Sequence, residues 1–188
     1  MSAIKGTALE SVVEDVNRLV AEASICRDDL EIRLSVKDLE ILDSKVQGAK
    51  WYPIDSYGRL SDLLMELEGH GRSAYLVERG RRAAKRLQGT GIYSQLSADR
   101  ERWGDRLGAI MASLGPAMFK DSDWSFELDS EGSASFLVRV RVSGGFPEAG
   151  RFAAQGFIDF LAKQSYQNAV VESRRVSDTE LEFSAREG

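Results

Sequence analysis

Cysteine, histidine and proline are scarce in this sequence of 188 residues, which has one cysteine (Cys26), one histidine (His70) and three prolines. One cysteine permits no internal disulfide, and one cysteine with one histidine cannot build a zinc site of the usual sulfur and nitrogen ligands. No apolar run approaches the roughly 20 residues of a membrane-spanning helix, and the first residues lack the apolar core of a signal peptide. These absences predict a cytoplasmic protein without a membrane span.

Several functional motifs are missing as well. The sequence has no glycine-rich phosphate loop and no Gly-x-Ser-x-Gly nucleophile elbow. No nucleophile and base stand in a recognisable pattern, so we expect a protein that is not an enzyme. The net charge of −5 argues against nucleic acid as a partner, because nucleic-acid binding usually needs a basic surface.

What the sequence does contain is an ordinary globular composition, with 43% hydrophobic and 29% charged residues. The length and the absence of a linker predict a single domain over 1–188. Its organisation changes near the middle, which divides it into a helical half (1–118) and a sheet-containing half (119–188).

The first half shows the three- and four-residue spacing of amphipathic helices. Thr7 and Glu10 match a capping box, which predicts that the first helix begins there. A short helix is expected from Ser35, longer ones over about 55–68 and 73–87, and a last one from Trp103 to Leu114 that Gly115-Pro116 would end. Residues 51–53 read as extended because a proline disfavours helix in the residue before it. The prediction is about five helices.

The second half alternates apolar and polar residues, as half-buried strands do. Strands are expected near 124–128, 136–142, 169–176 and 180–185, with a helix over about 148–163 between the two pairs. The predicted fold class is therefore α+β, with the helical half packed on a β-β-α-β-β antiparallel sheet.

Aromatic residues are the candidates for lining an interior pocket, since they are expected to converge between the helices and the sheet. An apolar ligand held there would be bound mainly by burial, although a plain aromatic core is the alternative. The candidate pocket residues are Trp103, Trp124, Phe126, Phe136, Phe146 and Phe160.

Basic residues crowd the helix over 73–87 and suggest a surface for an acidic partner. Four of them fall roughly on one stripe and are the partner-binding candidates: Arg72, Arg79, Arg82 and Arg86. The alternative is a solvated face paired with nearby acids. Gly80 and Ala84 lie four apart in the same helix and would let a neighbouring helix approach closely.

Three smaller features have ordinary structural interpretations. His70 stands between glycines and is read as an exposed turn residue. Cys26 is read as a half-buried structural cysteine. Arg139 and Arg141 are expected to pair across strands with Glu180 and Glu182, as opposite charges on one sheet face do.

The order of several short motifs resembles one superfamily of ligand-binding and assembly domains. Residues 152–161, 170–172 and 181–183 resemble the close of 4-vinyl-reductase-type domains, and the stretch from Tyr57 to Gly80 resembles the small subunits of the TRAPP tethering complex. Residues 5–9, 51–53 and 144–147 resemble an uncharacterised family abundant in myxobacteria, which is related to the haem nitric-oxide-binding domains. The resemblance implies a shared fold over nearly the whole chain and a bacterial protein.

Departures from these relatives restrict what the resemblance implies. Haem-binding members carry a histidine on the helix before the sheet, but the helix from Trp103 to Leu114 has none. They also carry Tyr-x-Ser-x-Arg on an early strand, where residues 137–141 lack the Tyr and the Ser. Haem is therefore disfavoured and no cofactor is expected. The hairpin cysteines of 4-vinyl-reductase-type sensors are missing, and Cys26 does not match the acylated cysteine of TRAPP subunits.

Two functions remain. The first is a non-enzymatic sensory domain that binds a small hydrophobic molecule between the helices and the sheet. The second is a TRAPP-like assembly subunit in signalling or tethering, which would form a homodimer or bind another cytosolic protein through its basic helix.

Overall fold

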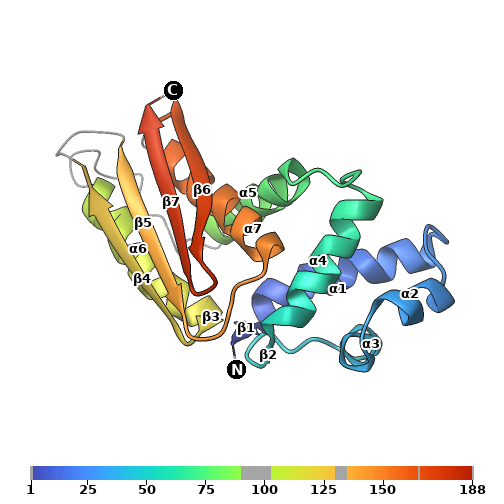
Figure 1. Cartoon of the computed structure of the whole chain (residues 1–188). Coiled ribbons are helices and arrows are strands. Elements are labelled where there is room, and N and C mark those ends of the chain that lie inside the picture. The colour runs from blue at the N-terminus through green and yellow to red at the C-terminus, as the bar shows by residue number, and fades with distance from the viewer. Residues whose placement is uncertain (1, 90–102, 130–134, 165, 188) are drawn as a thin grey trace.

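The computed structural model describes residues 2–89, 103–129, 135–164 and 166–187 (Figure 1). Its helices are α1 (Gly6–Ala21), α2 (Arg27–Arg33), α3 (Val36–Asp43), α4 (Ile54–Leu67), α5 (Ala74–Gly89), α6 (Trp103–Met118) and α7 (Glu148–Lys163). Its strands are β1 (Ala3–Lys5), β2 (Trp51–Pro53), β3 (Phe119–Lys120), β4 (Ser122–Leu128), β5 (Phe136–Val142), β6 (Ala169–Ser177) and β7 (Glu180–Glu187). The predicted α+β class is confirmed.

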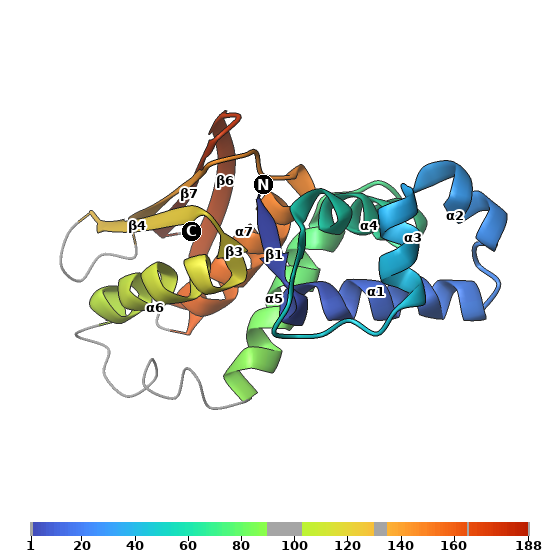
Figure 2. The ribbon, with the colours of Figure 1, turned by 90° about the horizontal axis from the view of Figure 1, so that it is seen from below.

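The larger sheet is antiparallel, with strand order β4-β5-β7-β6. Helices α6 and α7 lie on the same face of it, α6 along β4 and α7 along β6 (Figure 2). Period-two alternation decides which residues meet these helices: Val138 and Val140 are fully buried, whereas Arg139 and Arg141 lie on the other face. The predicted β-β-α-β-β order is confirmed.

A second, smaller sheet has the order β2-β1-β3 and joins the helical half to the sheet-containing half. The extended conformation of 51–53 is confirmed as β2, but the sheet itself was not predicted. Its strands are two or three residues long, too short for alternation to be recognised. They exist because residues distant in sequence pair with one another.

The start of α1 corrects the capping-box prediction. The helix begins at Gly6, and no side chain caps it. Instead, the N–H groups of Gly6 and Thr7 donate to the carbonyl oxygens of Lys50 and Gly48, at 2.8 and 3.2 Å. Backbone carbonyls of the segment before β2 thus accept hydrogen bonds from the first two N–H groups of the helix, which have no partner within it.

Two other helix boundaries differ from the prediction. No helix was predicted over 27–33, but these residues form α2, which is too short to show a clear apolar period. Helix α6 continues through Pro116 to Met118 instead of ending at Gly115. A proline within the last turn removes only one helical hydrogen bond. The helix start at Ser35 is confirmed, since Ser35 and Asp38 form a capping box there.

Glycines bring α5 and α7 into backbone contact. A Cβ atom on Gly80 would lie 1.9 Å from the carbonyl oxygen of Ala153, and one on Gly156 would lie 1.8 Å from that of Val77. No side chain fits at such distances, so each glycine accommodates the backbone of the other helix. The close approach predicted at Gly80 is confirmed, and Ala84 on the same face is fully buried.

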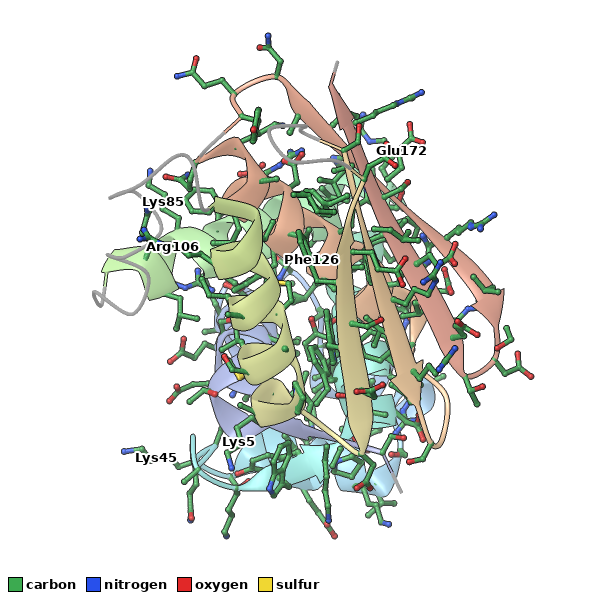
Figure 3. The ribbon with its side chains drawn as sticks, turned by 90° about the vertical axis from the view of Figure 1, so that its left-hand side faces the viewer. Lys5, Lys45, Lys85, Arg106, Phe126 and Glu172 are labelled. Carbon is green, nitrogen blue, oxygen red and sulfur yellow. The ribbon has the colours of Figure 1, made fainter. Side chains whose placement is uncertain are left out.

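Helix α6 approaches β4 in a similar way. A Cβ on Gly115 would lie 2.4 Å from the Trp124 ring, and one on Gly108 would lie 2.9 Å from the Phe126 ring. Side chains of the strand therefore fit into gaps along the helix. Figure 3 shows Phe126 between α6 and the sheet, with Glu172 on the opposite side of the sheet.

The hydrophobic core runs without interruption from α1 and α4 to the inner face of the sheet. It includes Leu9 and Leu64 at the helical end and Leu181 and Phe183 at the sheet end, all with no exposed surface. Among the described residues, no helix has both the length and the apolar character to cross a membrane.

Candidate ligand-binding site

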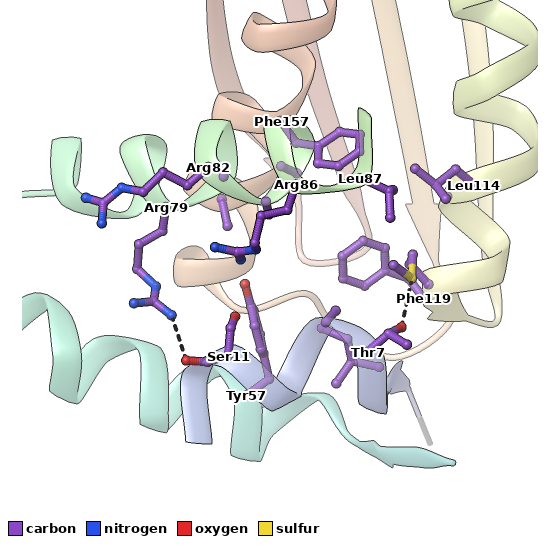
Figure 4. A pocket seen from close by; sticks show the side chains of 18 of the residues that line it. Thr7, Ser11, Tyr57, Arg79, Arg82, Arg86, Leu87, Leu114, Phe119 and Phe157 are labelled. Atoms are coloured by element: carbon purple, nitrogen blue, oxygen red, sulfur yellow. Dashed lines mark hydrogen bonds between the residues drawn. The ribbon is translucent and has the colours of Figure 1, made fainter. Parts of the chain in front are cut away.

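A cavity of about 400 Å³ lies between three pairs of packed elements (Figure 4). Helix α1 packs on α4, α5 packs on α7, and α6 packs on β4. The cavity between them receives side chains from β1, α1, α4, α5, α6, β3, β4 and α7. It lies between the helices and the sheet and opens to the surface, where the lining residues Thr7, Arg82 and Arg86 are exposed.

The lining divides into an apolar part and a polar part. The apolar side chains include Ile4, Val12, Leu87, Met111, Leu114, Met118, Phe119, Trp124, Phe157 and Ile158. The polar side chains are Thr7, Ser11, Asp15, Tyr57, Arg79, Arg82 and Arg86. A mostly apolar cavity with few polar groups is typical of small-molecule sites, and its volume falls in their range of roughly 300–1,000 Å³.

Four aromatic rings pack together at the end of the cavity near the small sheet, and two of them, Trp124 and Phe119, line it. Trp124 stacks on Phe119 at 5.9 Å between ring centroids and on Phe183 at 6.3 Å. Phe119 also contacts Phe146 at 4.9 Å. The Trp124 Nε1 donates to the Ser122 hydroxyl at 3.0 Å, which satisfies its one polar group. This wall is therefore rigid and apolar.

Tyr57 brings a phenol to the cavity from α4. It is 8% exposed, and burial raises the pKa of its hydroxyl, although the positive charge of Arg79 acts in the opposite direction. The hydroxyl therefore stays protonated at neutral pH, able to donate or accept a hydrogen bond.

Arg79 and Asp15 form an ion pair at the edge of the cavity. Arg79 Nη1 donates to the Asp15 carboxylate and, at 3.3 Å, to the Tyr75 hydroxyl, and Nη2 donates to the Ser11 carbonyl oxygen at 3.3 Å. The Arg79 side chain is only 13% exposed. Burial alone would lower its pKa, but the bonds to Asp15 and Tyr75 outweigh that effect. Arg79 thus connects α5 to α1.

The other two arginines of the cavity lie further along α5 and are exposed. Arg82 forms an ion pair with Glu78 at 3.6 Å, whereas Arg86 has no ion pair or hydrogen bond to any residue that the structure describes. In Figure 4, Arg86 extends from α5 toward α1 and Tyr57.

The six aromatic candidates lie in different surroundings. Trp124 lines the cavity, and together with Phe126 it also lines a second, shallower hollow between α6 and β4. Phe136 and Phe146 are buried in the core, and Phe160 is half-buried on α7. Trp103 opens α6, but its side chain lies outside the described residues.

The four arginines of the predicted basic stripe lie in different surroundings. Arg72 is exposed in the turn before α5, Arg79 is buried in its ion pair, and Arg82 and Arg86 border the cavity. The pairing expected on the sheet is present: Arg139 lies opposite Glu182 at 3.3 Å and Arg141 opposite Glu180 at 3.7 Å. Both sheet arginines face away from the cavity.

The single histidine and cysteine lie outside the cavity lining. His70 is exposed in the turn between α4 and α5, with a left-handed φ of 52°, as its interpretation as a turn residue requires. Cys26 is exposed rather than half-buried, which corrects that interpretation. It precedes α2, and its thiol contacts the Asp29 carboxylate at 3.1 Å.

Several lining residues were not among the candidates, notably Tyr57, Phe119, Phe157 and Met118. Each belongs to a helix stripe or a very short strand, where apolar residues normally form core. One signal was available in α5: Ala83 and Arg86 are three apart, so a small residue and a charge share a face. Nothing in the sequence showed that this face borders a void.

The fold and the cavity define an α+β domain with a site between its helices and its sheet. Solved structures of H-NOX proteins share this fold. A mutant Fe(II) unliganded H-NOX protein from K. algicida has a TM-score of 0.66 at 12% identity, over 98% of this chain and 97% of that chain. A mutant H-NOX protein from T. tengcongensis has a TM-score of 0.63 at 12% identity, over 97% of each chain. Cs H-NOX bearing an unnatural amino acid has a TM-score of 0.61 at 13% identity, over 97% of this chain and 96% of that one.

This likeness confirms the predicted haem-nitric-oxide-binding-like fold. No protein-family description matches the sequence, and neither does any curated protein. The resemblances to 4-vinyl-reductase-type domains, to TRAPP subunits and to the myxobacterial family stay predictions.

Proposed function

We propose that this chain is a non-enzymatic sensory domain that binds a small hydrophobic molecule in the cavity between α1, α5, α6 and the sheet. The observation that carries the proposal is the cavity itself, about 400 Å³ with a mainly apolar lining. Protein interiors are close-packed, and unfilled apolar space destabilises a fold in proportion to its volume. A bound molecule would remove that cost.

Haem is the ligand that the fold suggests, since one structural neighbour is described by its haem redox potential. The side chains of this cavity do not fit it. Haem iron is held by His, Cys, Tyr or Met with His, and His70 and Cys26 both lie outside the lining. Burial of Tyr57 favours its neutral form rather than a phenolate ligand, and Met111 and Met118 have no histidine to complete the set. We propose a ligand other than haem.

The alternative function, an assembly subunit that binds a partner through its basic helix, has less support. Arg79 was the central member of that stripe, and its guanidinium already bonds to Asp15 and Ser11 within the chain. Arg72, Arg82 and Arg86 are exposed, so charge reversal at these three with a pull-down would test the alternative.

A cavity-filling substitution tests the sensory proposal. Ala83 lines the cavity, so Ala83→Phe would place a ring inside it. We expect native mass spectrometry, or calorimetry with decanol as an apolar probe, to detect one bound molecule in the wild type and none in this variant. Ala117→Phe is the matched control, because Ala117 is exposed on α6 outside the lining. Failure of the wild type to bind any apolar probe would contradict the proposal.

A further inference from the structure

The charges that border the cavity differ in sign from those of the whole chain. The chain has a net charge of −5. Among the residues that the structure describes, the ionisable side chains that line the cavity and carry charge at neutral pH are Asp15, Arg79, Arg82 and Arg86, three positive and one negative. A local excess of positive charge next to an apolar space attracts anions, because the protein wall concentrates the field there.

Two of these four charges are already matched. The Asp15 carboxylate accepts a hydrogen bond from Arg79 and lies 3.6 Å from Arg18. Asp15 therefore offers little repulsion to an incoming anion, and Arg79 has little capacity left to bind one. The surplus charge belongs to the other two arginines.

Arg86 is the arginine best placed to bind a ligand. It has no ion pair or hydrogen bond to the described residues, and it lines the cavity beside Leu87. Figure 4 shows it directed from α5 toward α1 and Tyr57, across the cavity. The guanidinium group is a planar fork that can donate two parallel hydrogen bonds to a carboxylate.

Arg82 adds positive charge one helical turn before Arg86. Its contact with Glu78 is long, at 3.6 Å, and Glu78 also accepts from Arg81 at 3.4 Å. These are exposed contacts between neighbours on one helix, which contribute little energy. Arg82 can therefore support an anion bound by Arg86.

From these contacts we infer that the cavity takes an amphipathic anion, a molecule with an apolar chain or ring body and one carboxylate head. The body fills the space against Phe119, Trp124 and Phe157, and Arg86 binds the head at the edge, with the Tyr57 hydroxyl as a second donor on the facing side. This inference rests on the proposed function and adds the class of ligand to it.

Three probes with the same ten-carbon tail distinguish the contribution of the head group to binding from that of the apolar body: decanoate, decanol and decylamine. Isothermal titration calorimetry of the full chain near neutral pH measures each dissociation constant. We expect decanoate to bind about tenfold more tightly than decanol, as one charge-assisted pairing implies, and decylamine to bind most weakly. Raising the salt from about 0.05 to about 0.5 M should weaken decanoate only.

Two matched arginine variants locate the head group. Arg86→Gln keeps a polar side chain but removes the charge, so decanoate should lose its advantage while decanol affinity stays unchanged. Arg72→Gln removes a charge from the same predicted stripe outside the cavity and should leave all three affinities unchanged.

The outcomes distinguish this inference from the proposed function. Decanol and decanoate binding equally well would overturn the anion inference and leave the proposed function standing. A decanoate preference that survives Arg86→Gln would also overturn it, because the anion would then lie elsewhere. If none of the three binds, the proposed function fails and this inference fails with it. A preference for decanoate that Arg86→Gln removes would establish it.

Discussion

The two faces of α5 use small residues for opposite purposes. On one face, Gly80 and Ala84 are buried against α7, where the backbones of the two helices touch. On the adjacent face, Ala83 borders the cavity beside Arg86, and Gly80 lies at the boundary between the two faces. At Gly80 and Ala84, the small side chain lets a neighbouring helix approach closely, whereas at Ala83 it leaves space for the cavity. A small residue in a helix therefore does not by itself distinguish close helix packing from an unfilled space.

The largest effect is expected from breaking the packed face. Gly80→Leu would force a side chain into the Ala153 carbonyl, 1.9 Å from the new Cβ, and the helices would have to separate. We expect a loss of at least about 3 kcal/mol in the free energy of unfolding, measured by urea denaturation. Gly89→Ala is the control, because no described atom lies within 4 Å of its Cβ position, and its effect should stay within about 1 kcal/mol. Equal stabilities would show that the helices are not in contact.

Neighbouring alanines give the sharpest comparison between the faces. Ala84→Leu adds volume to a fully buried position and should cost about 2 kcal/mol by overpacking. Ala83→Leu adds the same volume beside the cavity and should change the free energy of unfolding by less than about 0.5 kcal/mol. Thermal and urea denaturation of the two variants would measure the difference. Matching losses would mean that the cavity has no room for a leucine.

Arginine substitutions compare two charges on the same helix: Arg79, which is bonded to α1, and Arg86, which has no ion pair with the described residues. Arg79→Gln breaks bonds to Asp15, Tyr75 and Ser11, and we expect a loss of about 1–2 kcal/mol because these groups are partly buried. Arg86→Gln removes no such bond within the described part of the chain and should stay within about 0.5 kcal/mol. Should Arg86→Gln destabilise the fold as much as Arg79→Gln, Arg86 would have a structural partner and could not serve as a free anchor.

The smallest effect concerns the protonation of Tyr57. Burial raises the pKa of its hydroxyl above the unfolded value, which is about 10. The folded state therefore binds this proton more tightly, so stability is unaffected below about pH 10 and declines as pH rises further toward the folded pKa. Ultraviolet absorbance titration should show a late-ionising tyrosine that disappears in Tyr57→Phe. Ionisation of every tyrosine near pH 10 would show that water reaches this hydroxyl.

Much of the fold could be predicted because, in most of the helices and strands, the local sequence pattern agrees with the burial of the residues in the tertiary structure. The β5 alternation from Phe136 to Val142 matches burial residue by residue, and the α7 boundaries follow the apolar period over 148–163. Predictions failed where long-range contacts replaced local ones. Thr7 makes no cap, and the carbonyls of Lys50 and Gly48 accept from the first N–H groups of α1. The strands β1, β2 and β3 exist only through pairing with one another.

The candidate site was harder to predict than the fold. Trp124 was a candidate because it is a large aromatic residue on a predicted strand. Tyr57, Phe119 and Phe157 also line the cavity, but in the sequence their positions are those of ordinary core residues. A void has no sequence pattern, since it arises where packed pairs of elements leave a gap. An apolar side chain produces the same sequence pattern whether it packs against a neighbouring element or lines a cavity.

The sequence by itself determined the longer helices and the four strands of the larger sheet, the faces that they bury, and the close approach at Gly80, because hydrophobic periodicity and residue size act over a few positions. Only the tertiary structure decided that Arg79 pairs with Asp15, that Arg86 has no ion pair with the described residues, and that both border a cavity. Those facts depend on how α1, α5 and α6 are placed in space. That placement is set by contacts between residues far apart in the chain, which local spacing does not record.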